Sequence, residues 1–360
     1  MRLRWTGRHR RPGAPPSCAR RAGNETEVIT GPWRAAAVLA PVAVFVVSLS
    51  VGRYPVSLDS LWSSAVTWAS GQEMSRADIA LMTIRMPRLC LALMVGAALS
   101  ASGTAFQGLF RNPVVSPDLL GASSGASFGA ALAILLGLSG PLVQALSFAT
   151  GLVAVLLVAT LAALVDRRTS GIVTMILCGM LVSSVFNAAV SLIKFVADTD
   201  TKLPAITYWL MGSLAGTRVD SLSTIWVFAP ACLLLYALSW KLNVLAMGDE
   251  EARMLGVNVR LYRWLIIACA TLLTSTSVSV SGNIGWIGLV VPHLARKLVG
   301  PDHVRLMWAS MSIGAAFLLL VDTIARLAST VEIPLGIITA FIGAPFFFTL
   351  ILRSRRGFLQ

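Results

Sequence analysis

The sequence offers few residues that could carry out chemistry. It has three histidines, and neither they nor the cysteines are grouped with carboxylates at the spacing of metal ligands. The five cysteines, which include no C-x-x-C pair, are Cys18, Cys90, Cys178, Cys232 and Cys269. No Gly-Lys dipeptide occurs, so the phosphate-binding loop G-x-x-x-x-G-K-[ST] is absent. We therefore predict no catalytic residue, no metal site and no cofactor bound by this chain. If ATP drives its activity, a separate subunit hydrolyses that ATP.

The composition is that of an integral membrane protein. Apolar residues make up 56% of the 360 positions and charged residues 12%, whereas a soluble domain carries about 25% charge. The net charge of +13 is typical of basic loops that face the cytoplasm and anionic lipid, and does not indicate a nucleic-acid partner. The predicted fold class is all-α, a polytopic helical membrane protein.

Apolar segments of about 20 residues can each cross a bilayer as a helix, and the sequence predicts about ten of them. The first covers 35–51 and lacks a small-residue cleavage site, so we expect it to be retained. The others are expected at 85–109, 119–137, 141–165, 171–197, 222–240, 264–281, 286–299, 306–328 and 335–352. They form one transmembrane domain, 35–352, between a basic tail at 1–34, predicted to be disordered, and a basic C-terminus at 353–360.

The basic residues predict the orientation of the chain, because Lys and Arg accumulate in cytoplasmic loops. With an even number of spans and both termini in the cytoplasm, most of the 29 basic residues lie inside. Those left outside are Arg53, Arg76, Arg85, Arg88, Lys194, Lys202, Arg218 and Arg326. Arg85 and Arg88, three apart at a helix start, can face one way and hold an acidic partner through charge-assisted pairs. Alternatively, their side chains extend to lipid headgroups.

Two cytoplasmic segments are candidates for function. Residues 246–257 form a charged stretch between apolar spans, which is either a docking element or a solvated connecting loop. Its apolar residues, which could form a short amphipathic surface, are Met247, Ala252, Leu255 and Val257. Asn112-Pro113 and Pro117 break helical hydrogen bonding after the second span, where freed backbone must be buried or line a watery cavity. This turn either lines such a cavity or is a plain Asx-Pro connection.

Other conspicuous residues are assigned to packing. Gly121, Gly125 and Gly129 recur every four residues and form the kind of stripe that allows two helices to approach closely. His293 and His303 lie near predicted cytoplasmic helix ends, and we assign each a structural role in preference to contact with an ATPase.

Several motifs follow one another along almost the whole chain. They are Arg85-Met-Pro-Arg-Leu89, Gly96-Ala-Ala-Leu99 with Gly103 and Gln107, Arg111-Asn-Pro-Val-Val-Ser-Pro117, Tyr208-Trp-Leu-Met-Gly-Ser213, Gly288-Leu-Val-Val-Pro-His-Leu-Ala-Arg296, Gly300-Pro-Asp-His303, Asp322 with Arg326, and Pro334-Leu-Gly-Ile-Ile-Thr-Ala-Phe-Ile-Gly-Ala-Pro-Phe346. In this order they resemble the FecCD-type permeases, the type II ABC importers of iron siderophores, haem and cobalamin. The 246–257 stretch resembles the cytoplasmic coupling segment of the same family.

The resemblance implies roles for particular residues. Arginines at the positions of Arg85, Arg88 and Arg326 receive glutamates of a periplasmic binding protein in this family. The turn that holds Asn112 and Val114 is similar to the family's cytoplasmic gate. The residues implied to contact the ATPase are Gly248, Asp249, Glu250, Ala252, Leu255 and Gly256.

The resemblance also implies partners. The expected protein is a multi-pass permease of the bacterial inner membrane that moves an iron chelate by alternating access, with ferric siderophore expected ahead of haem or cobalamin. Its partners would be two ATP-binding subunits that carry ATP and Mg, a periplasmic or lipid-anchored substrate-binding protein, a second identical or paralogous permease, and lipid. The alternative is an ion-coupled secondary transporter, which would need a carboxylate or His in mid-membrane. The nearest ones, Asp166 and Asp322, lie toward helix ends.

Overall fold

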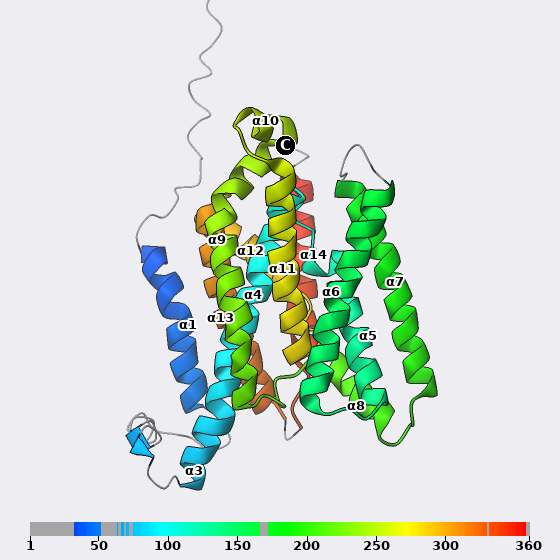
Figure 1. Cartoon of the computed structure of the whole chain (residues 1–360). Coiled ribbons are helices and arrows are strands. Elements are labelled where there is room, and N and C mark those ends of the chain that lie inside the picture. The colour runs from blue at the N-terminus through cyan, green and yellow to red at the C-terminus, as the bar shows by residue number, and fades with distance from the viewer. Residues whose placement is uncertain are drawn as a thin grey trace, which may run out of the picture.

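The computed structural model describes residues 32–51, 63, 66–67, 70–71, 75–165, 172–329 and 331–357. Over these ranges the chain forms helices and no strands (Figure 1). The predicted disordered tail lies almost wholly outside the described residues. The all-α prediction is therefore confirmed for the described part of the chain.

Each predicted span corresponds to a helix. These helices are α1 (Pro32–Ser50), α4 (Met86–Leu109), α5 (Ala122–Leu135), α6 (Gly140–Val165), α7 (Ile172–Val196), α9 (Ile225–Met247), α11 (Val259–Ser281), α12 (Ile287–Val299), α13 (His303–Leu327) and α14 (Leu335–Gly357). Within the described residues, six helices are long and apolar enough to cross a membrane: Ala80–Leu109, Gly140–Val165, Val173–Val196, Val219–Met247, Val259–Ser281 and His303–Leu327.

Two of the predicted spans are shorter than a full crossing. α5 has 14 residues and α12 has 13, which at 1.5 Å per residue covers about 20 Å of a hydrocarbon core roughly 30 Å thick. α5 begins after the left-handed Gly121 (φ 78°), and α12 lies between the positive-φ residues Trp286 and Gly300. The predicted bounds of these two spans, 119–137 and 286–299, lie within three residues of the observed helix ends, but the helices are too short for a full crossing, so the count of ten crossings is approximate.

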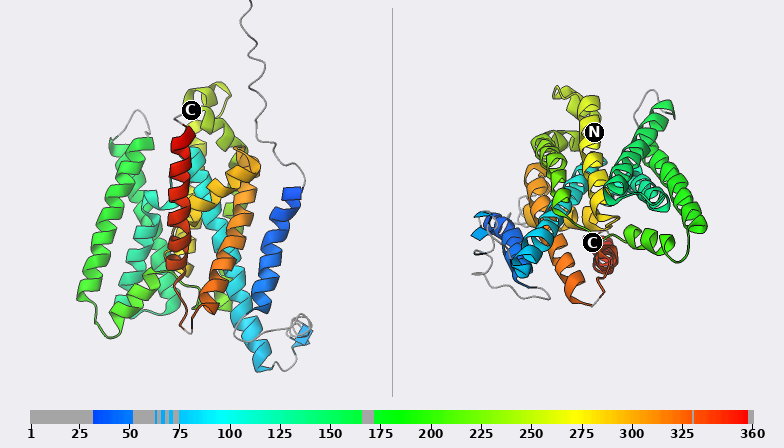
Figure 2. Two further views of the ribbon diagram at one scale, coloured as in Figure 1. Left: turned by 180° about the vertical axis from the view of Figure 1, so that it is seen from behind. Right: turned by 60° about the horizontal axis from the view of Figure 1, so that its bottom comes forward.

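Short helices connect the long ones at both ends of the bundle. They are α3 (Arg76–Ile79), the π-helical η2 (Ala80–Arg85), the 3-10 helices η3 (Pro117–Leu120) and η4 (Val219–Thr224), α8 (Lys202–Leu210) and α10 (Asp249–Met254). α3 and α8 lie at one end, here called the α8 end (Figure 1). α10, the start of α1 and the end of α14 lie at the opposite α10 end (Figures 1 and 2). This placement agrees with an even number of crossings.

α4 is the central helix of the bundle, and it contacts α9, α11, α12 and α13. The approach is closest at two glycines: a methyl group at Gly96 would overlap the backbone of Gly314 on α13, and one at Gly103 would overlap the backbone of Gly288 on α12. The predicted packing role of the α5 stripe is confirmed in the same way, because methyl groups at Gly125 and Gly129 would overlap residues of α6. Close backbone contact thus holds the interior together.

α11 fills its buried face with hydroxyl groups. Its buried Ser and Thr residues are Thr271, Thr274, Ser275, Thr276, Ser277, Ser279 and Ser281. Several donate to a carbonyl one turn earlier, as Thr274 does to Ala270 (2.9 Å) and Ser277 to Leu273 (2.7 Å). From α4, Ser102 bonds to α11: its Oγ donates to the carbonyl of Ala270 (2.8 Å) and pairs with the Thr274 hydroxyl (2.8 Å).

Candidate functional site

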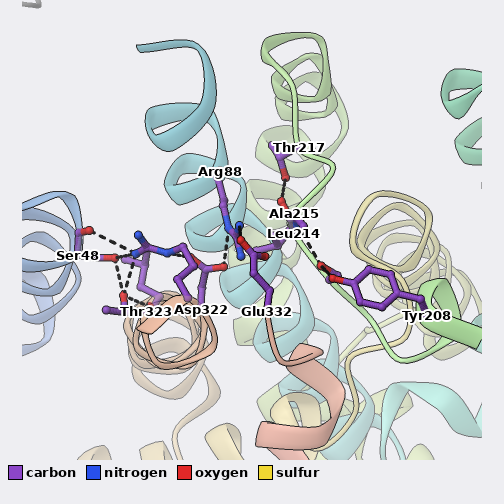
Figure 3. Close-up of polar contacts among 12 residues, drawn as sticks. Ser48, Arg88, Tyr208, Leu214, Ala215, Thr217, Asp322, Thr323 and Glu332 are labelled. Carbon is purple, nitrogen blue, oxygen red and sulfur yellow. Dashed lines mark hydrogen bonds and ion pairs between the residues drawn. The ribbon is translucent and has the colours of Figure 1, made fainter. Parts of the chain in front are cut away.

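At the α8 end, four charged side chains form a ladder that joins α4, α13 and the loop before α14 (Figure 3). The Arg88 guanidinium donates through Nε to Asp322 Oδ1 (2.8 Å) and through Nη1 to Glu332 Oε1 (2.8 Å). Arg326 Nε donates to Asp322 Oδ2 (3.0 Å), so Asp322 lies between two arginines. Arg326 Nη2 then reaches Ser48 Oγ on α1 (2.8 Å).

The ladder carries equal numbers of positive and negative charges and is mostly withdrawn from solvent. The Asp322 side chain is 0% exposed, Arg88 is 8%, Arg326 is 12% and Glu332 is 30%. Buried charges persist only when they are paired and hydrogen-bonded. Asp322 is therefore the structural centre of this ladder, while Glu332 lies at its rim.

Arg85 and Arg88, predicted to be able to face one way, have different hydrogen-bond partners. Arg88 points into the bundle toward Asp322 and Glu332, whereas Arg85 Nη1 donates to the carbonyl of Leu49 on α1 (2.8 Å). The π-helical segment η2 ends at Arg85, so the helix is wound differently on either side of this residue. The sequence predicted that Arg85, Arg88 and Arg326 lie at the same end of the bundle. It did not predict Glu332, which is 244 residues from Arg88 in the chain.

At the α10 end, a second charged cluster surrounds Asp249, the first residue of α10. Arg263 Nη2 on α11 donates to both carboxylate oxygens of Asp249, at 2.8 Å each. Arg111 Nη2 lies 3.8 Å from Asp249 Oδ1. Asp249 therefore connects the short helix α10 to α11 and to the turn that follows α4.

Arg111 adopts a left-handed backbone (φ 51°) at the end of α4. Its N–H donates to the carbonyl of Gly108 (3.2 Å), and that of Asn112 donates to Gln107 (3.1 Å), as in a Schellman helix ending. Glycine is the usual residue at this position, because the left-handed backbone conformation of any residue with a side chain is less stable by about 1–2 kcal/mol. The arginine places a side chain at this position that reaches Asp249.

The turn and the coupling segment have exposed surfaces. Asn112 Oδ1 accepts from Val114 N (3.0 Å), so the Asx-type turn is present, and Val114 is 54% exposed. In the 246–257 segment, Ala252 and Val257 are buried, so the single amphipathic surface predicted for the segment was wrong. The exposed apolar residues are Met247, Met254 and Leu255.

His303 packs against the interior, as the sequence predicted. Its Nδ1 lies 2.8 Å from Asn243 Oδ1 on α9, and its ring lies against Gly108.

A groove of about 680 Å³ lies between α8, the start of α12 and α14. Asn283, Trp286 and Phe341 line it, and none of its described lining residues is charged. Over the described ranges, no three His, Cys, Asp or Glu side chains gather as they would around a metal ion.

Comparison with known proteins identifies the family. Residues 39–353 match the model of the FecCD transport family. The chain belongs to the FecCD transport family. It is therefore a multi-pass permease of the inner membrane and the membrane component of an ABC transporter, not an enzyme; ATP hydrolysis belongs to separate ATPase subunits.

FecCD relatives align over most of their length. The molybdate import permease MolB of Haemophilus influenzae is 40% identical, covering 88% of this chain and 94% of the relative. A Helicobacter pylori protein described as a probable iron chelatin transport permease is 38% identical, covering 88% and 97%. Among solved structures, an inward-facing metal-chelate type ABC transporter aligns with a TM-score of 0.79 and 37% identity, covering 89% of this chain and 98% of that one. Their cargoes differ, and the family alone does not fix the substrate.

Proposed function

We propose that this FecCD permease carries an iron chelate, most specifically a ferric siderophore, inward by alternating access. The supporting observation is the groove between α8, α12 and α14, whose described lining residues are uncharged and whose volume of about 680 Å³ suits a bulky cargo delivered by another protein. Relatives described as iron chelatin and metal-chelate transporters support the same cargo class. Two permeases would enclose the pathway, and the α10 end would face the cytoplasm and two ATPases.

The two charged clusters supply the proposed partner contacts. The outer surface around Arg85, Arg88 and Arg326 would receive acidic residues of a substrate-binding protein. The coupling segment, residues 246–257, would contact an ATPase through its exposed Met254 and Leu255, since exposed apolar side chains on a polar loop favour a protein partner. The gate would lie at Asn112 and Val114, next to Arg111.

Transport in proteoliposomes tests this function. The permease, reconstituted with its ATPase and supplied with the loaded binding protein, should take up a ⁵⁵Fe-labelled ferric siderophore only when ATP is present. Molybdate and haem are the competing cargoes: uptake of molybdate instead would contradict the chelate proposal, and uptake of haem instead would contradict the siderophore assignment. Uptake by the permease alone, driven by an ion gradient and abolished by an ionophore, would instead establish the secondary transporter.

Replacing Asp249 with Asn tests the coupling cluster. The carboxylate would lose its charge-assisted bonds to Arg263, which are worth about 1.5–3 kcal/mol when buried and less at this partly exposed site. We expect the ATPase to remain bound while uptake per ATP hydrolysed falls by about fivefold, a change of about 1 kcal/mol.

The control for this variant is Glu251→Gln, which removes an exposed charge from the same short helix. Equal uptake per ATP in Asp249→Asn and Glu251→Gln would remove Asp249 from the coupling path. Loss of ATPase binding in Asp249→Asn would show that Asp249 only holds α10 in place.

A further inference from the structure

We propose that Glu332 is a displaceable internal ligand of Arg88, and that an acidic residue of the docking protein takes its place. This inference rests on the proposed function, because it requires a protein that docks at the α8 end. It assigns Glu332 a regulatory role at that surface: the residue competes for the arginine that the partner needs.

The ladder contains one carboxylate that can leave. Asp322 is fully buried and holds two arginines, so its removal would leave both cations without their shared anion. Glu332 is 30% exposed, lies in the loop between α13 and α14, and shares one bond with Arg88. Its second oxygen, Oε2, is buried and has no hydrogen-bond partner within the described residues. Glu332 is thus held less completely than Asp322.

The charges at Arg88 favour exchange of one carboxylate for another over addition of a third carboxylate to the ladder. The ladder already pairs two guanidinium groups with two carboxylates (Figure 3). A further carboxylate at Arg88, with Glu332 in place, would bring like charges together in a poorly solvated site. If Glu332 turns out into water as the partner's carboxylate enters, the number of charges around the arginines stays the same.

Release of Glu332 from Arg88 would free the loop that leads into the start of α14. The loop that carries Glu332 leads to Leu335 and Gly336, whose N–H groups donate to the carbonyls of Gly212 (2.9 Å) and Met211 (3.1 Å) at the end of α8. Met211 and Gly336 both line the groove. The exchange therefore links docking at the outer surface to two of the helices that form the proposed pathway.

The test is the affinity of the purified binding protein of the same transport system for the full transporter in nanodiscs. Glu332→Gln keeps the size of the side chain but removes its charge, so it competes less well for Arg88. We expect this variant to bind the partner about two- to fivefold more tightly than wild type, the scale of one partly exposed ion pair. A structural role for Glu332 would instead weaken binding.

Asp220→Asn is the matched control, because Asp220 is exposed in η4 at the same end and its loss changes the net charge equally. Tighter binding by Glu332→Gln but not by Asp220→Asn supports exchange. Equal tightening in both variants would reduce the effect to long-range electrostatics, and unchanged or weaker binding by Glu332→Gln would also overturn the proposal. If the wild-type transporter binds no partner, the proposed function itself fails.

Discussion

Replacing Asp322 with Ala is expected to destabilise the permease so strongly that little folded protein is obtained. The side chain is fully buried between Arg88 and Arg326, so its loss leaves two buried cations without their shared partner. Breaking a buried pair in this way costs about 3–5 kcal/mol, which is a large part of the stability of most proteins. We expect the thermal unfolding temperature in detergent to fall sharply, together with the yield of monodisperse protein.

Two further variants separate charge from packing. In the double variant Asp322→Ala with Arg326→Leu, one unpaired cation is also removed, so part of the lost stability should return. Glu332→Gln acts at the exposed rim of the same ladder and should change stability by less than about 1 kcal/mol. An unfolding temperature of Asp322→Ala equal to that of wild type would show that the buried ladder contributes little to the fold.

Replacing Gly103 with Val should also abolish folding. Gly103 lies on the central helix α4, where even a methyl group would overlap the carbonyl of Gly288 on α12. Overpacking a core costs about 1–3 kcal/mol when side chains can adjust, and more when two backbones must separate. We expect aggregation on extraction from the membrane, measured by fluorescence-detected size-exclusion chromatography.

The matched control is Gly216→Ala. Gly216 has no neighbour within 4 Å of the added methyl group, and its backbone does not need a positive φ. This variant should elute like the wild type. A symmetric elution peak at the wild-type position for Gly103→Val would show that α4 and α12 can separate without loss of the fold.

The helices could be predicted because each one is determined by the apolar residues of its own segment. A long apolar stretch can satisfy its backbone in a bilayer only as a helix, so each predicted span corresponds to an observed one. The ends of α12 were predicted to within one residue, at 286–299, but the backbone conformation at its start was not. Trp286 has a positive φ, which is unusual for a residue with a side chain, and its ring packs against Gly343 on α14. Such a break depends on tertiary packing and leaves little local pattern.

The candidate sites could be predicted only in part. The outer arginines were visible because basic residues are scarce on that side, but their partners are far away in the sequence: Asp322 is 234 residues from Arg88. The link from Asp249 to Arg111 depends on a helix ending that usually takes glycine, which nothing in the spacing of these residues indicates. The docking, coupling and gate roles of these residues stay predictions.

The hydroxyl row of α11 affects how easily the bundle can change shape. Thr274, Thr276 and Ser277 bond to their own helix, so these bonds move with α11 as a unit. Among the described residues, the side-chain hydrogen bonds between α4 and α11 are those of Ser102, and a movement of α11 along α4 would break them at a cost of about 1 kcal/mol each. Because the hydroxyl groups of Thr274, Thr276 and Ser277 bond within α11, few side-chain hydrogen bonds of the described residues hold that helix against α4, and we expect the interface to shift at low cost.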